Sequence, residues 1–159
     1  MRIFTEFIIL SEDLPMMDYE LLFPLMWQAK EFDSDGNFYS NFPENKWSNL
    51  VLTVFSEDKT IELSRVNIDV CREDSNAIAS SNNLLQLAYL EEKKIHGYAF
   101  FPPLTIIQML AATSITINTI NENLYIDFLK SVYKFLVYTK GYIVNCGMLD
   151  AEKFKQEFL

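Results

Sequence analysis

The chain is short of the residues that small catalytic and cofactor sites use most often. Its 159 residues include 4 glycines, 2 cysteines and 1 histidine. Glycine-rich turns bring backbone N–H groups close to phosphate, so this composition argues against a nucleotide-binding enzyme. His96 has no partner at the spacing of a zinc-binding helix, and we expect it to lie at a helix end beside Gly97. The sequence therefore predicts no catalytic residue, no metal and no cofactor.

Long apolar runs are also missing. No window approaches the roughly 18 apolar residues of a membrane helix. Glu6 interrupts the apolar run near the N-terminus and no small-residue cleavage site follows, which argues against a secretory signal. Cys71 and Cys146 are isolated, and we interpret them as two buried thiols in a reducing cytosol, with a single long-range disulfide as the alternative. We expect a cytoplasmic protein that does not bind membranes.

Basic residues are scarce in the first half of the chain. Residues 1–80 hold 15 acidic and 6 basic residues, a net charge of −9, whereas residues 81–159 hold 7 of each. Contacts to phosphate require Lys and Arg, so an acidic chain is not expected to bind nucleic acid. The second half carries the long apolar segments. One part of the chain is thus expected to display charge while the other supplies much of the core.

Half of the residues are hydrophobic and 14% are aromatic, with 13 phenylalanines, which is enough to form a core. At this length we expect one domain spanning residues 1–159. Strand-like and helix-like segments follow one another without regular alternation, which favours an α+β fold. The predicted architecture is a mostly antiparallel sheet with a central hairpin at about 49–70, packed against three or four helices.

The hairpin is the clearest local prediction, with its turn at residues 56–59. In its return strand the apolar residues change parity between Leu63 and Val66. Because side chains alternate between the two faces of a strand, this change requires an extra residue, and we predict a β-bulge near Ser64–Arg65. Further strands are expected at residues 2–10, 115–117 and 142–146. Residues 104–113 fit a buried helix or a strand equally well.

Apolar residues at helical spacing predict three helices and a short terminal one. Pro24 must lie in the first turn of the first helix or kink it. In the longest helix Ser131 is expected on the polar face, and Gly141 is expected to end it. The terminal helix is expected to be capped by Asp150. The predicted helices cover residues 18–32, 84–94 and 122–140, with the short one after Asp150.

Asp33, Asp35 and Glu44 have the spacing of oxygen ligands in a calcium-binding loop. Phe38 stands where such a loop needs glycine, and Pro43 denies it the exiting helix. We favour an Asx-rich turn and leave open whether the segment binds a cation. The same loop holds aromatic rings, Trp47 among them, which either anchor the loop to its own domain or contact a partner.

The remaining acids lie on the hairpin and just after it. A net charge spread evenly is screened within about 8 Å at physiological salt, whereas a focused acidic face steers a cationic protein into association. We therefore expect these acids to converge on one exposed face that binds a basic protein. The candidate partner-binding residues are Asp33, Asp35, Glu44, Trp47, Glu57, Asp58, Asp69, Glu73 and Asp74.

In size, acidity, lack of catalytic residues and an Arg-poor, Ile/Asn/Lys-rich composition, the chain resembles the immunity proteins of bacterial polymorphic and contact-dependent toxin systems. The resemblance rests on no motif and assigns no residue. It implies a cytosolic, non-enzymatic inhibitor of a cognate toxin domain, often a basic nuclease.

Two other functions stay open. One is a structural or adaptor subunit of a phage or bacterial assembly, for which residues 104–113 would form an exposed apolar patch. The other is a small carboxylate-dependent enzyme.

Overall fold

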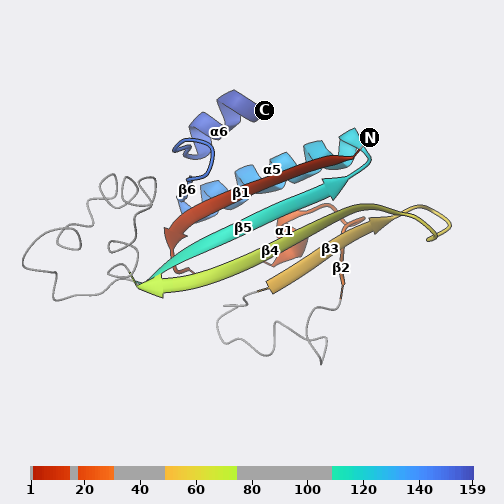
Figure 1. Ribbon diagram of the computed structural model, residues 1–159, viewed down its shortest axis with the longest axis horizontal. Helices are drawn as coiled ribbons and strands as arrows, with labels where there is room; N and C mark the ends of the chain where they lie inside the picture. The colour runs from red at the N-terminus through yellow and green to blue at the C-terminus, as the bar shows by residue number, and fades with distance from the viewer. Residues whose placement is uncertain (1, 15–17, 31–48, 75–108) are drawn as a thin grey trace, which may run out of the picture.

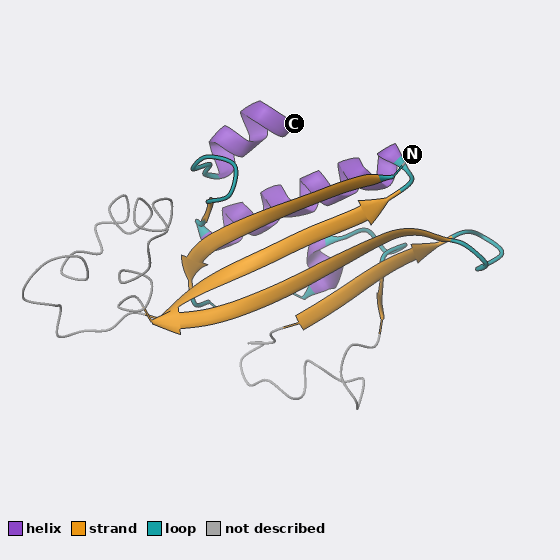
Figure 2. Ribbon diagram, in the orientation of Figure 1, coloured by secondary structure: helices purple, strands orange, loops and turns teal. Residues whose placement is uncertain are grey.

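A computed structural model describes residues 2–14, 18–30, 49–74 and 109–159. The described chain forms a six-stranded antiparallel sheet in the order β2-β3-β4-β5-β1-β6, with three helices packed against it (Figures 1 and 2). The predicted single α+β domain with a central hairpin is confirmed. The elements are β1 Ile3–Glu12, α1 Tyr19–Leu22, β2 Gln28–Lys30, β3 Asn49–Phe55, β4 Glu62–Asp74, β5 Met109–Thr119, α5 Glu122–Thr139, β6 Tyr142–Ile143 and α6 Ala151–Phe158.

One face of the sheet packs against the helices and holds the main core. Register places Phe7 opposite Ile115, and Ile115 opposite Ile68, so the three side chains form one row across β1, β5 and β4. All three are buried, as are Phe128 and Phe135 of α5 above them. Every second residue of each strand points to this face, because strand side chains alternate. Burial of this apolar surface is the main force that holds the two layers together.

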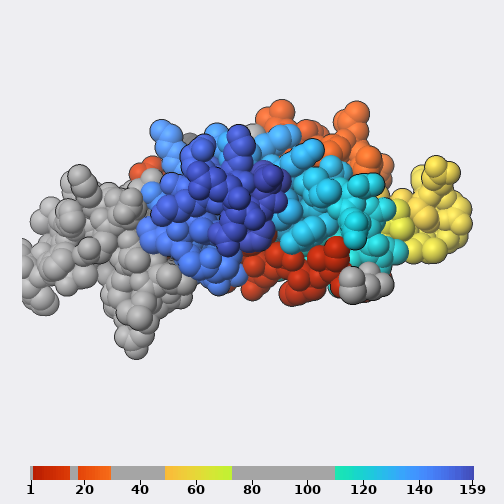
Figure 3. Space-filling view, turned by 90° about the horizontal axis from the view of Figure 1, so that it is seen from above, coloured from red at the N-terminus to blue at the C-terminus, as the bar shows by residue number. Residues whose placement is uncertain are grey.

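Helix α6 covers the edge of the sheet through Phe7. The ring of Phe7 lies 5.5 Å from that of Phe154 and 5.3 Å from that of Phe158, both in edge-on contact. Asp150 caps this helix as predicted, because its carboxylate accepts a hydrogen bond from the Lys153 N–H at 2.9 Å. A view along the sheet edge shows α6 over the middle of the molecule and the hairpin turn projecting at one end (Figure 3).

The hairpin carries the predicted irregularity. Val54 pairs with Ser64 but Phe55 pairs with Glu62, so Leu63 is the extra residue. It lies one position before the predicted bulge at Ser64–Arg65. The bulge lets Leu63 and the following core residues of β4 pack against the same core despite the change of parity.

The predicted helix at residues 18–32 is wrong. Helix α1 has four residues, and Phe23 is already extended, with φ −117° and ψ 149°. A residue before proline is driven out of the helical region, so Pro24 ends the helix rather than starting or kinking it. The chain then forms strand β2 at the edge of the sheet.

Helix α5 matches its prediction in length but differs at two residues. Ser131 is buried rather than on the polar face, and its hydroxyl donates to the Leu22 carbonyl at 2.7 Å. Lys140, not Gly141, takes the left-handed conformation after the helix, with φ 53°. Gly141 is required for a different reason, since a Cβ there would lie 2.9 Å from the Leu10 carbonyl oxygen.

From Met109 onward, the ambiguous segment 104–113 is strand β5, with Leu110 and Ala111 buried. The described part therefore does not supply the exposed apolar patch expected of an adaptor subunit. Strand β6 is shorter than predicted. The predicted helix at 84–94 and His96 lie outside the described residues. Among the helices that are described, none is both long and apolar enough to cross a membrane.

Candidate functional site

The face of the sheet opposite the helices is a candidate binding surface. Figure 2 shows α1 and α5 behind the strands, so no described helix covers the front of β3, β4, β5 and β1. We call the central part of this front surface the open face. All of its residues are exposed or half-buried: Phe4, Glu6, Ile8, Asn49, Val51, Arg65, Asn67, Asp69, Ser114, Thr116 and Asn118.

Two exposed carboxylates lie near the middle of the open face. Ser114 stands directly opposite Asp69 in the β4–β5 register, and its hydroxyl donates to Glu6 Oε2 at 3.1 Å. Neighbouring strands are about 4.8 Å apart, so Glu6 and Asp69, on strands two apart, are separated by roughly 10 Å across the sheet. In the described structure neither carboxylate has an ion pair. This arrangement can receive cationic side chains.

The cations of the open face lie toward the hairpin end. Arg65 forms an ion pair with Glu62 at 2.8 Å, which offsets its charge. Arg2 donates from Nη1 to the Asn118 side-chain carbonyl at 2.9 Å. The open face is therefore negative at Glu6 and Asp69, close to neutral at Arg65, and positive at the corner that holds Arg2.

Glu57 and Asp58 lie in the hairpin turn. The Asp58 carboxylate accepts hydrogen bonds from the hydroxyls of Ser56, at 2.6 Å, and Thr60, at 2.7 Å, and from the Thr60 N–H at 3.1 Å. These bonds, foremost that from Ser56, favour the charged form and lower the pKa of Asp58. Asp58 thus shapes the turn, while Glu57 is exposed.

The structure does not bring the described candidate acids together. Glu73 and Asp74 pair with Leu110 and Met109 at the far end of β4 from the turn that holds Glu57 (Figure 1). Strand β4 has 13 residues, and at about 3.3 Å per residue its ends are roughly 40 Å apart. Only Asp69 lies on the open face between these ends. Asp33, Asp35, Glu44 and Trp47 lie outside the described residues.

The prediction of two buried cysteines is wrong. Cys71 and Cys146 are both exposed. Cys71 has the parity of Asp69 and so points away from the helices, and Cys146 follows the short strand β6 rather than lying in it. Partial burial raises the pKa of the Cys146 thiol, with a smaller contribution from the Glu157 carboxylate.

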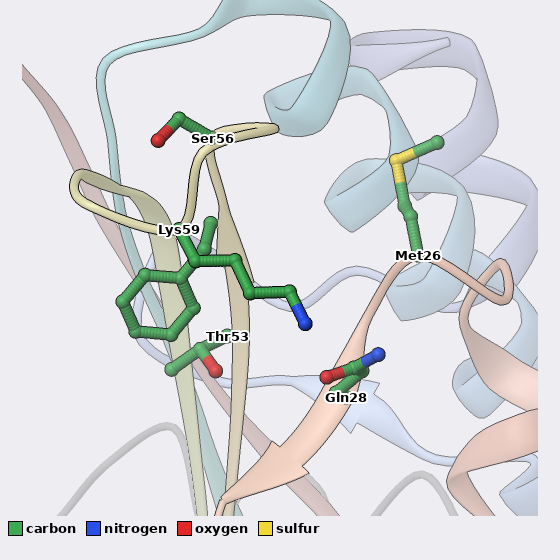
Figure 4. A pocket seen from close by; sticks show the side chains of 6 residues that line it. Met26, Gln28, Thr53, Ser56 and Lys59 are labelled. Carbon is green, nitrogen blue, oxygen red and sulfur yellow. The ribbon is translucent and has the colours of Figure 1, made fainter.

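A hollow of about 350 Å³ lies at the end of β3 that leads into the hairpin turn. Figure 4 shows the Lys59 side chain reaching from the turn back toward Gln28 and Thr53, with Met26 on the opposite side. Lys59 is the one titratable group of its lining, which is Met26, Gln28, Thr53, Phe55, Ser56 and Lys59. The hollow can accept a small group with an apolar part and an acceptor. Within the described ranges, no three His, Cys, Asp or Glu side chains are grouped closely enough to hold a metal.

Sequence reasoning missed Glu6 and Ser114 as surface residues. The alternation of side chains along β1 could have indicated Glu6, because Phe7 and Ile9 are buried and the residues that alternate with them belong to the other face. Comparison of the chain with protein-family models, curated proteins and solved structures finds no match.

Proposed function

We propose that this chain is a non-enzymatic binding protein that takes a basic protein partner on the open face. In the form that the resemblance suggests, it is an immunity protein that blocks a cognate toxin domain, for example a basic nuclease. The observation that carries the proposal is the pair of exposed carboxylates, Glu6 and Asp69, on a sheet face with no described helix over it.

Electrostatics supports a cationic partner. The chain has a net charge of −9, and the Glu6 and Asp69 carboxylates have no ion pair in the described part of the molecule. Their separation of roughly 10 Å is comparable to the screening length of about 8 Å at physiological salt, so a lysine or arginine that docks between them interacts with both. Such a field accelerates encounter more than it strengthens the final complex.

Shape and chemistry support a protein rather than a small molecule. The open face is broad, and Asn49, Asn67 and Asn118 present amides that both donate and accept hydrogen bonds. Protein interfaces combine such polar groups, at about one hydrogen bond per 100–200 Å², with apolar anchors. Phe4, which is 68% exposed, supplies an anchor at the corner of this face.

The test compares Asp69→Lys with Glu157→Lys as baits for proteins from the source organism. Both residues are exposed and both substitutions change the charge by the same amount, but Glu157 lies on α6. We expect wild type and Glu157→Lys to retain the same basic partner, and Asp69→Lys to associate at least about tenfold more slowly at low salt. The captured protein is then purified and its association rate measured against salt.

Equal association rates for Asp69→Lys and wild type at low salt would refute binding at the open face. An immunity function further requires that co-expression of the chain protects cells from the captured protein, and that Asp69→Lys protects them less.

A second candidate function is an adaptor subunit, favoured by apolar side chains at the β2 end of the sheet. Leu25 is 92% exposed, and its neighbour Met26, also exposed, lines one hollow together with the exposed Phe55. Exposed apolar groups gathered in one place mark protein contacts. If this function is correct, Leu25→Ser will abolish incorporation into an assembly and leave association at Asp69 unchanged.

A further inference from the structure

Among the described strands, the outer edge of β1 is paired over only part of its length. Strand β6 pairs with Ile9 and Leu10, and the Val144 N–H donates to the Ile8 carbonyl at 2.9 Å. The Asn145 side chain then continues the ladder in place of a backbone. Its amide accepts from the Ile8 N–H and donates to the Glu6 carbonyl, both at 2.9 Å.

Beyond Asn145 the edge is unpaired within the described part of the chain. In an antiparallel strand, alternate residues direct both backbone groups to the same side. Because Ile8 and Glu6 direct theirs outward, the N–H and C=O of Phe4 also point outward, as does the Glu6 N–H. No backbone within the described ranges pairs with them. Figure 3 shows the residues of β1, in red, at the surface beside α6. An unpaired edge of this kind is a template for another strand.

We propose that a second copy of this chain pairs its β1 antiparallel to residues 2–6, giving a two-fold dimer with one continuous sheet. Phe4 then faces Phe4 of the second copy, and Arg2 faces Glu6 of the second copy on both sides of the axis. All of these side chains point to the open face, since they share the parity of Glu6 and Ile8. The proposal does not depend on the proposed function.

The charges are complementary in this register. Within one copy, Arg2 and Glu6 are four residues apart, about 14 Å along a strand, and in the described structure they form no ion pair with each other. Across the axis they stand directly opposite, where unlike charges stabilise a strand pair. Each side chain also keeps a second hydrogen-bonding atom for this pair, because Arg2 uses Nη1 for Asn118 and Glu6 uses Oε2 for Ser114. A shift by two residues places Arg2 against Phe4 and loses both charge pairs.

The same geometry limits the dimer. Asn145 occupies the edge from Glu6 onward, so the pairing ends there in each copy and involves five residues. Strand β6 of each copy pairs with Ile9 and Leu10, outside the paired segment. The interface is smaller than that of a standard stable complex, so we expect weak, concentration-dependent association in the micromolar to millimolar range.

The test measures the sedimentation of the purified full chain as a function of concentration. We expect wild type to form dimers, and Arg2→Glu and Glu6→Arg each to weaken dimerisation at least about tenfold, because each variant places like charges opposite one another. Mixing the two variants restores both unlike pairs and should restore the dimer as a heterodimer. Glu157→Arg, an equal charge change on α6, should leave the wild-type dimer intact.

A cross-link tests the register independently of affinity. In a Cys71→Ser/Cys146→Ser background, Phe4→Cys places two thiols opposite each other at the axis and should form a disulfide-linked dimer on oxidation. Asn118→Cys, exposed on β5 and away from the edge, should not. A chain that stays monomeric up to millimolar concentration, or variants whose mixture fails to associate, would overturn the proposal. If the chain is monomeric, the unpaired edge of β1 is available to a strand of another protein instead.

Discussion

At the residue scale, glycines and polar side chains have specific structural roles in this chain. Gly141 and Gly147 show two different requirements for glycine. Gly141 lies where β1 passes close by, so a Cβ would contact the Leu10 carbonyl oxygen at 2.9 Å and the Ile9 side chain at 3.0 Å. Gly147 has φ 86° and open space around it.

We therefore predict that Gly141→Ala destabilises the protein by about 2–3 kcal/mol, because a backbone carbonyl cannot move aside as a flexible side chain can. Gly147→Ala should cost about 1 kcal/mol, the cost of a left-handed conformation without a clash. Urea unfolding of both variants gives the two values. If Gly141→Ala is the milder of the two, the close packing of residue 141 against β1 is wrong.

Asp58 provides a prediction about pH. Its pKa is lowered in the folded state by hydrogen bonds from Ser56 and Thr60, so the charged form contributes stability. For a lowered pKa, that contribution is present above the unfolded value of about 4 and is lost as the pH falls through the folded value. The stability difference between wild type and Asp58→Ala should therefore shrink below about pH 4. Glu57→Ala, which removes the neighbouring charge and leaves these hydrogen bonds in place, is the matched control for the measurement.

At the element scale, one hydroxyl joins two helices that are distant in the sequence. Ser131 of α5 donates to the Leu22 carbonyl at the end of α1, at 2.7 Å, and to the Asp127 carbonyl of its own helix at 2.9 Å. This bond satisfies a carbonyl that the early end of α1 leaves without a helical partner. It also explains why a serine occupies a buried position on α5.

We predict that Ser131→Ala destabilises the protein by about 1–2 kcal/mol, because a buried carbonyl loses its donor. Ser64 is the matched control, since its hydroxyl is also buried but has no hydrogen-bond partner among the described residues. Ser64→Ala should be neutral or stabilising, because it removes an unsatisfied polar group. Thermal unfolding of both variants checks the contrast, and equal losses would contradict it.

The elements that the sequence predicted correctly are those with a sustained local pattern. The hairpin, the long helix and the capped terminal helix each have a periodicity or cap that depends only on neighbouring residues. The prediction of a helix at 18–32 was wrong because Pro24 restricts the backbone of Phe23 to extended conformations, and this restriction outweighed the helical spacing of the apolar residues. The prediction that Ser131 lies on the polar face of the long helix was wrong because its hydrogen-bond partner, Leu22, is 109 residues away in the sequence.

At the scale of the whole molecule, the negative charge of the described residues is distributed along the sheet rather than gathered in one place. The turn at Glu57 and the end of β4 at Glu73 are opposite ends of one long hairpin, and Asp69 lies between them. Some acids are also paired internally. Asp13, with a side chain only 8% exposed, accepts from Arg72 at 2.9 Å and so joins the end of β1 to β4.

The candidate binding surface follows from this arrangement. Because all three described helices pack on one face, the middle of the other face presents alternate residues of β1, β3, β4 and β5, whereas Leu10 and Leu110 are buried there in a small second cluster with Val144. Asp69 was among the predicted partner-binding residues, but its neighbours Glu6 and Ser114 were not. They meet Asp69 only through the pairing of β5 with both β1 and β4.

The sequence by itself determined the fold class, the hairpin with its bulge, the long helix and the acidic balance, because each depends on composition or on spacing within a few residues. The tertiary structure decided which acids share a surface, which cysteines are exposed and which edge is left unpaired among the described strands. These depend on strand order and register, which bring β1, β4 and β5 together from both halves of the chain, and no local pattern encodes that pairing.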